Sequence, residues 1–207
     1  MMEAIIEELE NPQKKVRPLS GLSTPVYYDW PKILDQNVQS EILSLMNKVL
    51  EKEDTIGFPG PLSKEEGESV IGSLASSVAT GSKHLLLMRE QDTNRIVGHL
   101  ILSPSTLPNC RHVAEISRVF VHPEYRGVAS IRIGMREVLA RCEYLGIDTI
   151  TLDVRANTRI HKLWQALGFD TIGIMQDYAR VNGKSYAGCY MYQSISVLKD
   201  RMSILSS

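Results

Sequence analysis

The stretch AEISRVFVHPEYRGVASI, residues 114–131, predicts a strand, a turn and the start of a helix in direct succession. Residues 114–121 alternate between two expected faces, one with Ile116, Arg118 and Phe120 and the other with Glu115, Ser117, Val119 and Val121. After the turn HPEYRG, apolar residues recur at helical spacing at Ile131, Met135, Val138, Cys142 and Leu145. Gly146 is the expected helix stop.

Further regular elements are predicted on both sides of this stretch. Ser63 and Glu66 match a capping box that opens a helix, and Asn157 is the expected N-cap of a short helix that ends at Gly168. The other predicted elements are a helix at 36–53 and strands at 26–30, 84–90, 95–102, 149–154, 169–175 and 186–195. This order predicts one α/β domain over residues 21–207, after a loosely ordered extension at 1–20.

The composition argues against several classes of partner. The 207 residues include 23 basic and 24 acidic ones, so the formal charge of -1 gives no electrostatic footprint for nucleic acid or an anionic membrane. No apolar run is long enough to span a bilayer, and the N-terminal residues lack the features of a secretion signal. We expect a cytoplasmic protein with a small-molecule partner, no nucleic-acid partner and no membrane partner; the oligomeric state, a homodimer included, is left open.

The cysteines and histidines do not form a metal-binding pattern. Cys110, Cys142 and Cys189 lie far apart and outside any C-x-x-C motif, which favours a reducing compartment and a role as small buried hydrophobes. No two of the five histidines have metal-ligand spacing, so no metal is predicted. His122 is expected to be exposed in the turn, and His161 to lie on the polar side of its helix.

Two motifs in this order of elements resemble the Gcn5-related N-acetyltransferase (GNAT) superfamily. They are the stretch at 114–131 and NTRIHKLWQALGF at 157–169. The resemblance extends over roughly residues 26–195 and implies a mixed central sheet of about six to seven strands flanked by about four helices. The tail at 168–192 is more weakly similar to the fungal branch that acetylates proline analogues such as azetidine-2-carboxylate.

The resemblance implies that acetyl-CoA binds at the turn after the strand. A pyrophosphate is held by backbone N–H groups at a helix N-terminus, and the expected loop residues are Arg126, Gly127, Val128, Ala129, Ser130 and Ile131. Ala129 stands where the family has glycine and Ile131 where it has a small residue. We expect Ile131 to turn inward to the sheet and the Ser130 hydroxyl to donate a hydrogen bond to the ligand. The alternative is an ordinary strand-to-helix turn.

The same resemblance implies a path for the pantetheine arm of the cofactor. The backbone of Val119, Phe120 and Val121 would pair with the arm as a strand would, and Asn157 would contact it from the end of the next strand. Asn157 is alternatively a helix N-cap alone, or serves in both roles.

The implied chemistry is acyl transfer from acetyl-CoA to an amine. Glu115 is the candidate general base, with a surface carboxylate as the alternative. Trp164 occupies the position where the family commonly has a tyrosine that protonates the leaving thiolate, and we expect Trp164 to be core packing. The acid would then be water or one of the tyrosines at 178, 186, 190 and 192, of which we select Tyr190.

The acceptor is expected to be a small molecule with an amine, such as an amino or imino acid. Phe58, in the apolar segment TIGFPGP, and Tyr27 or Tyr28 are candidate lining residues, with core or turn packing as the alternative. Arg118 and Asn157 are candidate partners for a carboxylate, although Arg118 would equally suit a salt bridge across the sheet. A protein acetyltransferase and a catalytically degenerate acyl-CoA-binding regulator remain as alternatives.

Overall fold

The computed structural model describes residues 25–53, 57–126 and 128–204. Its strands are β1 (Val26–Asp29), β2 (His84–Glu90), β3 (Ile96–Pro104), β4 (Val113–Val121), β5 (Thr149–Arg155), β6 (Asp170–Val181) and β7 (Lys184–Ser194). Its helices are α2 (Gln36–Leu50), α3 (Lys64–Ala79), α4 (Val128–Leu145), α5 (Arg159–Leu167) and α6 (Ile195–Ile204), with short 3₁₀ turns η1 (Pro108–Cys110) and η2 (Pro123–Tyr125). The predicted extension at 1–20 lies outside these residues.

All seven strands form one mixed sheet in the order β1-β2-β3-β4-β5-β7-β6. Only β4 and β5 pair in parallel, and each of the other neighbouring pairs is antiparallel. The helix α4 connects the two parallel strands, as a parallel connection requires. The predicted fold class, a mixed α/β sheet with flanking helices, is confirmed.

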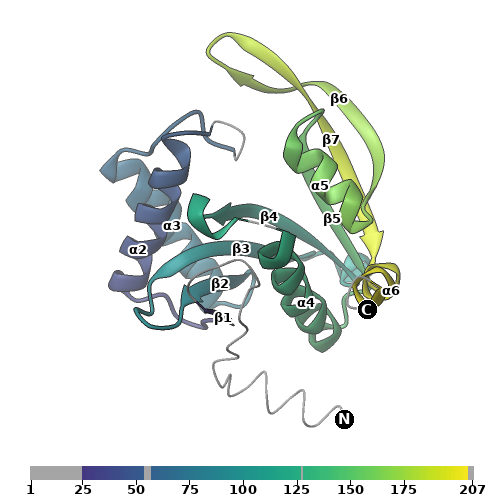
Figure 1. Cartoon of the computed structure of the whole chain (residues 1–207), viewed down its shortest axis with the longest axis horizontal. Helices are drawn as coiled ribbons and strands as arrows, with labels where there is room; N and C mark the ends of the chain where they lie inside the picture. Colours follow the sequence, from purple (N-terminus) through teal and green to yellow (C-terminus); the bar gives the residue numbers. More distant parts are fainter. Residues whose placement is uncertain (1–24, 54–56, 127, 205–207) are drawn as a thin grey trace.

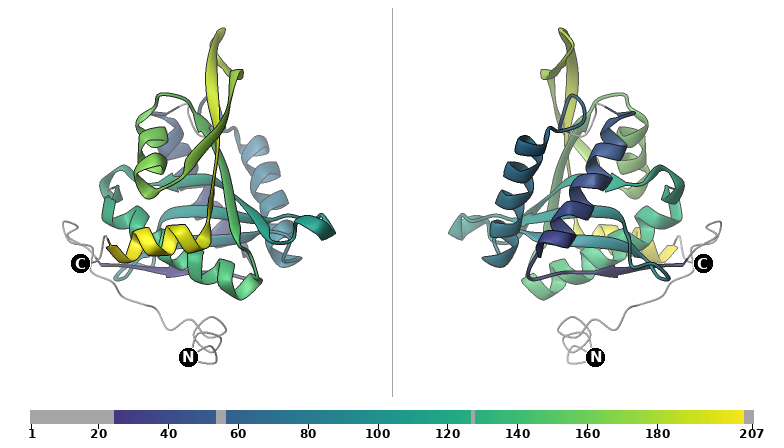
Figure 2. Two further views of the ribbon diagram at one scale, coloured as in Figure 1. Left: turned by 90° about the vertical axis from the view of Figure 1, so that its right-hand side faces the viewer. Right: turned by 90° about the vertical axis from the view of Figure 1, so that its left-hand side faces the viewer.

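The helices cover both faces of the sheet, with α2 and α3 on one face and α4, α5 and α6 on the other (Figure 2). Each face has its own buried core. Ile42 and Phe120 belong to the core under α2 and α3, which we call the α2/α3 core. Ile116 and Val138 belong to the core under α4, which we call the α4 core. A side chain of the central strands is therefore assigned to a face by the core it joins.

Local sequence signals set several element ends as predicted. The capping box is present, because the Ser63 hydroxyl accepts from the Glu66 N–H at 3.2 Å and the Glu66 carboxylate accepts from the Ser63 N–H at 2.9 Å. Gly146 follows α4 with a φ of 69°, a conformation that glycine adopts without strain. The helix predicted to run to residue 53 ends earlier, at Leu50.

The predicted alternation of β4 is wrong beyond Ser117, because the strand contains a bulge. Ile101 of β3 pairs with Ser117, but His99 pairs with Phe120, so β4 has an extra residue between these pairs. Arg118 lies in this interval with a φ of 49°, in the left-handed region. As a result Ile116 and Phe120 join opposite cores rather than one face.

The C-terminal strands are longer than predicted and an additional helix follows them. β6 has 12 residues and β7 has 11, and their hairpin projects beyond the rest of the sheet (Figure 1). The helix α6, which the sequence did not predict, contributes Leu198 and Met202 to the α4 core. The hairpin of β6 and β7 therefore extends the sheet beside β5, and the helix α6 that follows it packs into the α4 core.

Candidate functional site

The parallel strands β4 and β5 stay paired over only three residue pairs, from Val113↔Thr149 to Glu115↔Thr151. Beyond Glu115 the strands diverge (Figure 1), since β5 continues to pair with β7 as far as Arg155↔Gly188. From Ser117 to Val121, β4 pairs with β3 alone. One backbone edge of this segment therefore has no strand partner among the described residues, and it offers the N–H and C=O groups that an extended ligand can pair with. Val119, Phe120 and Val121, selected from the sequence, lie on this edge.

The turn at 122–126 leads from this edge to the N-terminus of α4. The first turn of α4 contains no acidic residue, so its free N–H groups remain favourable for an anion. The Arg126 Nε donates to the Val121 carbonyl oxygen at 3.0 Å, and its Nη1 forms an ion pair with Glu53 after α2. Gly127 and the side chains of Val128 and Ala129 lie outside what the structure describes.

The remaining two loop residues, Ser130 and Ile131, both turn away from solvent. Ser130 is buried, and its hydroxyl donates to the Tyr125 carbonyl oxygen at 2.6 Å. This hydrogen bond closes the turn, so the hydroxyl would have to leave the Tyr125 carbonyl oxygen to donate to a phosphate, as the sequence predicts. Ile131 packs against the α4 core, so the predicted inward orientation is confirmed.

An apolar cavity of about 40 Å³ lies under the first turn of α4. Val119 and Val121 of β4, Met88 of β2 and Ile131 are among its lining residues. Tyr28 also lines it, and its hydroxyl donates to the Ser130 carbonyl oxygen at 3.0 Å. The start of α4 thus rests on a small hollow rather than on a fully filled core.

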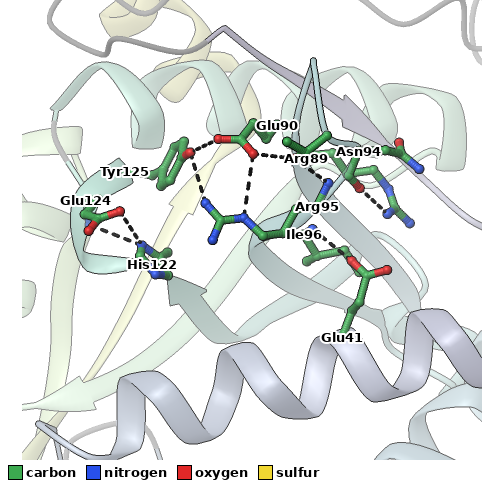
Figure 3. Close-up of polar contacts among 10 residues, drawn as sticks. Glu41, Arg89, Glu90, Asn94, Arg95, Ile96, His122, Glu124 and Tyr125 are labelled. Carbon is green, nitrogen blue, oxygen red and sulfur yellow. Dashed lines mark hydrogen bonds and ion pairs between the residues drawn. The ribbon is translucent and has the colours of Figure 1, made fainter.

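A polar cluster fixes the outer side of the same turn (Figure 3). The Tyr125 hydroxyl donates to the Glu90 carboxylate of β2. Arg95 donates to the Tyr125 oxygen at 3.3 Å, and its Nε lies 3.7 Å from Glu90. The turn before α4 is therefore tied to the hairpin of β2 and β3.

His122 belongs to this turn and is buried, so the prediction of an exposed residue is wrong. The side chain is 5% exposed, and its ring packs edge-on against Tyr125 with centroids 5.7 Å apart. Its Nδ1 accepts from the Glu124 N–H at 3.4 Å. Burial, with Lys48 as the next largest influence, lowers its pKa, so His122 is neutral at physiological pH.

Glu115 ends the paired part of β4 and points away from the α4 core, since its neighbours Ala114 and Ile116 both join that core. Its side chain is exposed, as in the surface-carboxylate alternative, but partial desolvation raises the pKa of its carboxyl, and the nearby carboxylate of Asp153 raises it further, whereas Lys83 lowers it. No ion pair involves Glu115 in the part of the chain that the structure describes.

Beside Glu115, the strands β5 and β7 present an acidic, aromatic surface that we call the tyrosine wall. It consists of Asp153, Tyr178, Tyr190 and Tyr192. Asp153 is the direct partner of Tyr190, and Thr151 is the partner of Tyr192, so these side chains share the face opposite the α4 core. The Tyr178 hydroxyl donates to Asp153, and its ring meets that of Tyr190 edge-on at 6.4 Å.

The three tyrosines of the wall differ in what their hydroxyls can do. Burial and the hydrogen bond to Asp153 raise the pKa of Tyr178 far above its ordinary value. A hydroxyl that already donates to a carboxylate is a poor proton donor to anything else. Tyr190 and Tyr192 are 39% and 40% exposed and are accessible to a ligand.

Arg118, at the bulge of β4, faces the same side as the tyrosine wall. Its guanidinium lies over the ring of Phe58 at 5.4 Å from the centroid, and Phe58 packs against the α2/α3 core. Burial lowers the pKa of Arg118. No carboxylate pairs with Arg118 in residues 25–53, 57–126 and 128–204, so the alternative of a cross-sheet salt bridge finds no support there.

Comparisons with known proteins agree with this arrangement. The model of the acetyltransferase (GNAT) family matches residues 45–169, which is more than half of the chain. The chain belongs to the acetyltransferase (GNAT) family. It is an N-acetyltransferase that uses acetyl-CoA, and the diverging strands and the acid-free start of α4 fit that co-substrate. A search of curated proteins finds no match.

Solved structures of GNAT proteins share the fold at low sequence identity. A candidate acetyltransferase of Acinetobacter baylyi has a TM-score of 0.70 and 18% identity, with 83% of this chain and 94% of that chain covered. A phosphinothricin acetyltransferase of Sinorhizobium meliloti in complex with AcCoA has a TM-score of 0.65 and 18% identity, with 82% and 88% covered. A ribosomal-protein-alanine N-acetyltransferase of Brucella melitensis has a TM-score of 0.65 and 16% identity, with 81% and 98% covered.

The second GNAT motif begins differently from the prediction. Thr158, not Asn157, is the N-cap of α5, because the Thr158 hydroxyl accepts from the His161 N–H at 3.2 Å. Asn157 precedes it in the left-handed region, with a φ of 59°, and its side chain is exposed at the end of β5. The exposed side-chain amide of Asn157 is accessible to a ligand, whereas its backbone N–H donates to His161 Nδ1 at 3.3 Å.

Two further side chains of this motif point inward. His161 is 9% exposed, and its Nε2 lies 3.3 Å from the Thr171 hydroxyl, so the prediction that it lies on the polar side is wrong. Trp164 is buried, and its ring packs edge-on against Phe169 at 5.2 Å. The prediction that Trp164 is core packing is confirmed.

Sequence reasoning did not identify Asp153, and it named Tyr178 only as one of four candidate acids. A usable signal was present, since the alternation of the strand TITLDV places Asp153 on the face opposite Leu152 and Val154. In the described ranges, no group of three or more His, Cys, Asp or Glu side chains is arranged to hold a metal ion. No helix there is long and apolar enough to cross a membrane.

Proposed function

We propose that this N-acetyltransferase acetylates the amine of a small molecule that also carries a carboxylate, an amino or imino acid such as azetidine-2-carboxylate. The observation that supports this most is Arg118, a half-buried guanidinium with no carboxylate partner among the described residues. Glu115 and Asp153, on the same face, provide the opposite charge. A zwitterion has a group for each pole, since a guanidinium fork suits a carboxylate and an acidic aromatic surface suits an ammonium.

The proposed acetyl-CoA site combines the loop at 126–131 with the free edge of β4. The backbone N–H groups of Arg126, Gly127, Val128, Ala129, Ser130 and Ile131 would surround the pyrophosphate at the start of α4. The backbone of Val119–Val121 would pair with the pantetheine arm, and the exposed amide of Asn157 would contact it. When bound, acetyl-CoA supplies the activated acetyl group.

In the proposed mechanism Glu115 accepts the proton that the attacking amine loses, directly or through a water. Its raised pKa brings the carboxylate closer to the operating pH, which improves a general base. His99 of β3, which pairs with Phe120, is not a candidate base, because burial and Arg118 lower its pKa to about 3. Tyr190 is the proposed proton donor to the thiolate, since Tyr178 already donates to Asp153.

A protein acceptor is the second candidate. β6 is an edge strand with Ile172, Ile174 and Met175 exposed, and such an edge can pair with an extended peptide. The named neighbours include both a phosphinothricin enzyme and a ribosomal-protein enzyme, so the names do not decide between the two classes.

The acceptor proposal is tested by measuring release of free CoA thiol from acetyl-CoA with free amino and imino acids, polyamines and a lysine-containing peptide. We expect saturable turnover with azetidine-2-carboxylate or a related small acid. Turnover of the peptide with no activity on any free amino acid would establish the second candidate. Binding of acetyl-CoA without turnover of any acceptor would identify a degenerate regulator.

The cofactor loop is tested separately by Gly127→Glu, with Gly72→Glu as the matched control. A carboxylate at residue 127 should repel the pyrophosphate and abolish the rise in melting temperature that acetyl-CoA causes. A side chain at Gly72 of α3 meets no atom within 4 Å, so the control adds the same charge at a distant open site. An unchanged acetyl-CoA shift in Gly127→Glu would refute the loop assignment.

A further inference from the structure

Tyr125 holds the turn at 122–126 through its side chain and through its backbone. Its side chain is 5% exposed, and its hydroxyl donates to Glu90 of β2. Its backbone carbonyl oxygen accepts from the Ser130 hydroxyl, in the first turn of α4, at 2.6 Å. A single residue therefore connects the central sheet to the N-terminus of α4.

Glu90 is a buried carboxylate with several partners on the hairpin of β2 and β3 (Figure 3). The side chain is 10% exposed, and it accepts from the Thr93 hydroxyl and the Tyr125 hydroxyl. These hydrogen bonds lower its pKa, and Arg95 lies 3.7 Å away. Because the carboxylate is held from the hairpin side, it is a fixed point to which Tyr125 is tied.

The chain of contacts continues past Ser130 to the opposite side of the helix start. The Ser130 carbonyl oxygen accepts from the Tyr28 hydroxyl at 3.0 Å, and Tyr28 lines the cavity under α4. With a cavity beneath it, this first turn is held in place by hydrogen bonds more than by close packing. Loss of the Tyr125 anchor would leave the turn held by the Tyr28 hydrogen bond and by the packing of Ile131, with less restraint on its position.

We propose that Tyr125 and Glu90 are positioning residues for acetyl-CoA, which fix the first turn of α4 without touching the co-substrate. The proposal rests on the loop assignment made above. An anion at a helix N-terminus is bound by N–H groups that already point toward it, and ordering a mobile turn on binding weakens affinity. Acetyl-CoA affinity should therefore depend on this network, while the acetyl-transfer step should not.

The test compares Tyr125→Phe with Arg89→Met. Tyr125→Phe removes only the hydroxyl, and Arg89→Met removes the neighbouring ion pair of β2, where Arg89 Nε lies 3.1 Å from Asp29. Arg89 is 6% exposed and none of its hydrogen bonds reaches the turn at 122–126, so its loss should lower the melting temperature alone.

We expect Tyr125→Phe to raise KM for acetyl-CoA about tenfold, the scale of a lost hydrogen bond to a charged group, with kcat within about twofold of the parent. The dissociation constant of acetyl-CoA from calorimetry, measured without an acceptor, should rise by the same factor. Arg89→Met should leave both values unchanged. Equal KM in Tyr125→Phe and the parent, or an equal rise in both variants, would overturn the proposal.

Glu90→Gln and Glu90→Leu provide a second comparison that does not depend on the folding of Tyr125→Phe. Glutamine keeps an oxygen that accepts from Tyr125, so Glu90→Gln should weaken acetyl-CoA binding less than Glu90→Leu. Equal binding by both and the parent would overturn the proposal. If Gly127→Glu loses acetyl-CoA binding while Tyr125→Phe and Glu90→Leu keep it, only the positioning role fails; if Gly127→Glu keeps it, the loop assignment itself fails.

Discussion

The polar side chains at the C-terminal end of β4 have different partners on the two faces of the sheet. On the side of α4, the hydroxyls of Ser130 and Tyr125 both donate hydrogen bonds within the protein. On the side of α2, Arg118 and Glu115 keep their charges without an ion-pair partner in the described residues. The α4 side, where we propose that acetyl-CoA binds, therefore offers mainly backbone groups, whereas the α2 side, where we propose that the acceptor binds, offers charges without an ion-pair partner among the described residues.

This difference indicates where specificity resides. A backbone site recognises a co-substrate that is the same for every acceptor, so its side chains can serve the fold. A partly buried charge without an ion-pair partner, such as that of Arg118, costs stability in the free protein, and a ligand with a matching group reduces this cost. The acceptor is therefore better inferred from Arg118 and the tyrosine wall than from the loop.

The largest expected effect comes from Glu115→Gln, which tests the functional role of the unpaired charge. Loss of a general base should lower kcat by about 10²–10⁴-fold, with little change in acetyl-CoA affinity. The deficit should shrink at high pH, where the amine is already deprotonated. The pH dependence of kcat/KM should also lose its acidic limb. Parental turnover at neutral pH would return Glu115 to a structural role.

The same variant tests the cost of that charge to stability. Burial raises the pKa of Glu115 above its ordinary 4.5, so the folded state holds the proton more tightly than the unfolded state. The stabilisation by the protonated form is present below pH 4.5 and is lost as the pH rises through the folded pKa. Glu115→Gln should therefore melt no lower than the parent at pH 7. A clear drop in the melting temperature of Glu115→Gln would contradict the view that the Glu115 charge destabilises the free protein.

A smaller effect is expected from Tyr190→Phe, with Tyr192→Phe as the control on the same wall. We expect kcat to fall by about tenfold, less than for a typical general acid, because a thiolate is a good leaving group. Tyr192 has a similar exposure, 40% against 39%, and its loss should leave kcat near the parental value. Equal kcat in both variants and the parent would assign the proton to water.

The smallest effect on rate is expected from Trp164→Phe, which changes a buried side chain of the α4 core. The substitution should lower the free energy of unfolding by about 1–3 kcal/mol through lost packing against Phe169. It should leave kcat within about twofold of the parent, since an indole N–H is not an acid at neutral pH. Thermal melting and steady-state kinetics of one preparation check both values. A tenfold fall in kcat would place Trp164 in the chemistry.

The sequence predicted the elements well where local signals decide them. Ser63 with Glu66, Gly146 and the two apolar strands at 84–90 and 95–102 all depend on neighbouring residues, and their predictions are confirmed. Alternation failed at Arg118, because a non-glycine residue in the left-handed region gives no sign of a bulge in the sequence. That failure matters, since Arg118, the residue on which the acceptor proposal rests, lies at the bulge and faces Phe58 on the α2/α3 side.

The conformation and burial of side chains around the proposed site were predictable only in part. Asn157 and Thr158 are both good N-caps, and only the backbone conformation decides that Thr158 takes the role. His161 lies against Thr171 of β6, and His122 packs against Tyr125 of its own turn, so the burial of both depends on contacts that side-chain spacing alone does not reveal. Contacts between distant residues also create the tyrosine wall, so the sequence named its tyrosines without their arrangement.

The measurement that tests the acceptor proposal most directly crosses Arg118→Met with two acceptors, azetidine-2-carboxylate and its amide. Methionine keeps an unbranched side chain at the bulge, so the backbone at this position is not further strained. On the carboxylate, Arg118→Met should raise the acceptor KM about 30-fold or more, the scale of a lost buried charge pair. On the amide, parent and variant should have the same KM. An equal change on both acceptors would contradict carboxylate recognition by Arg118.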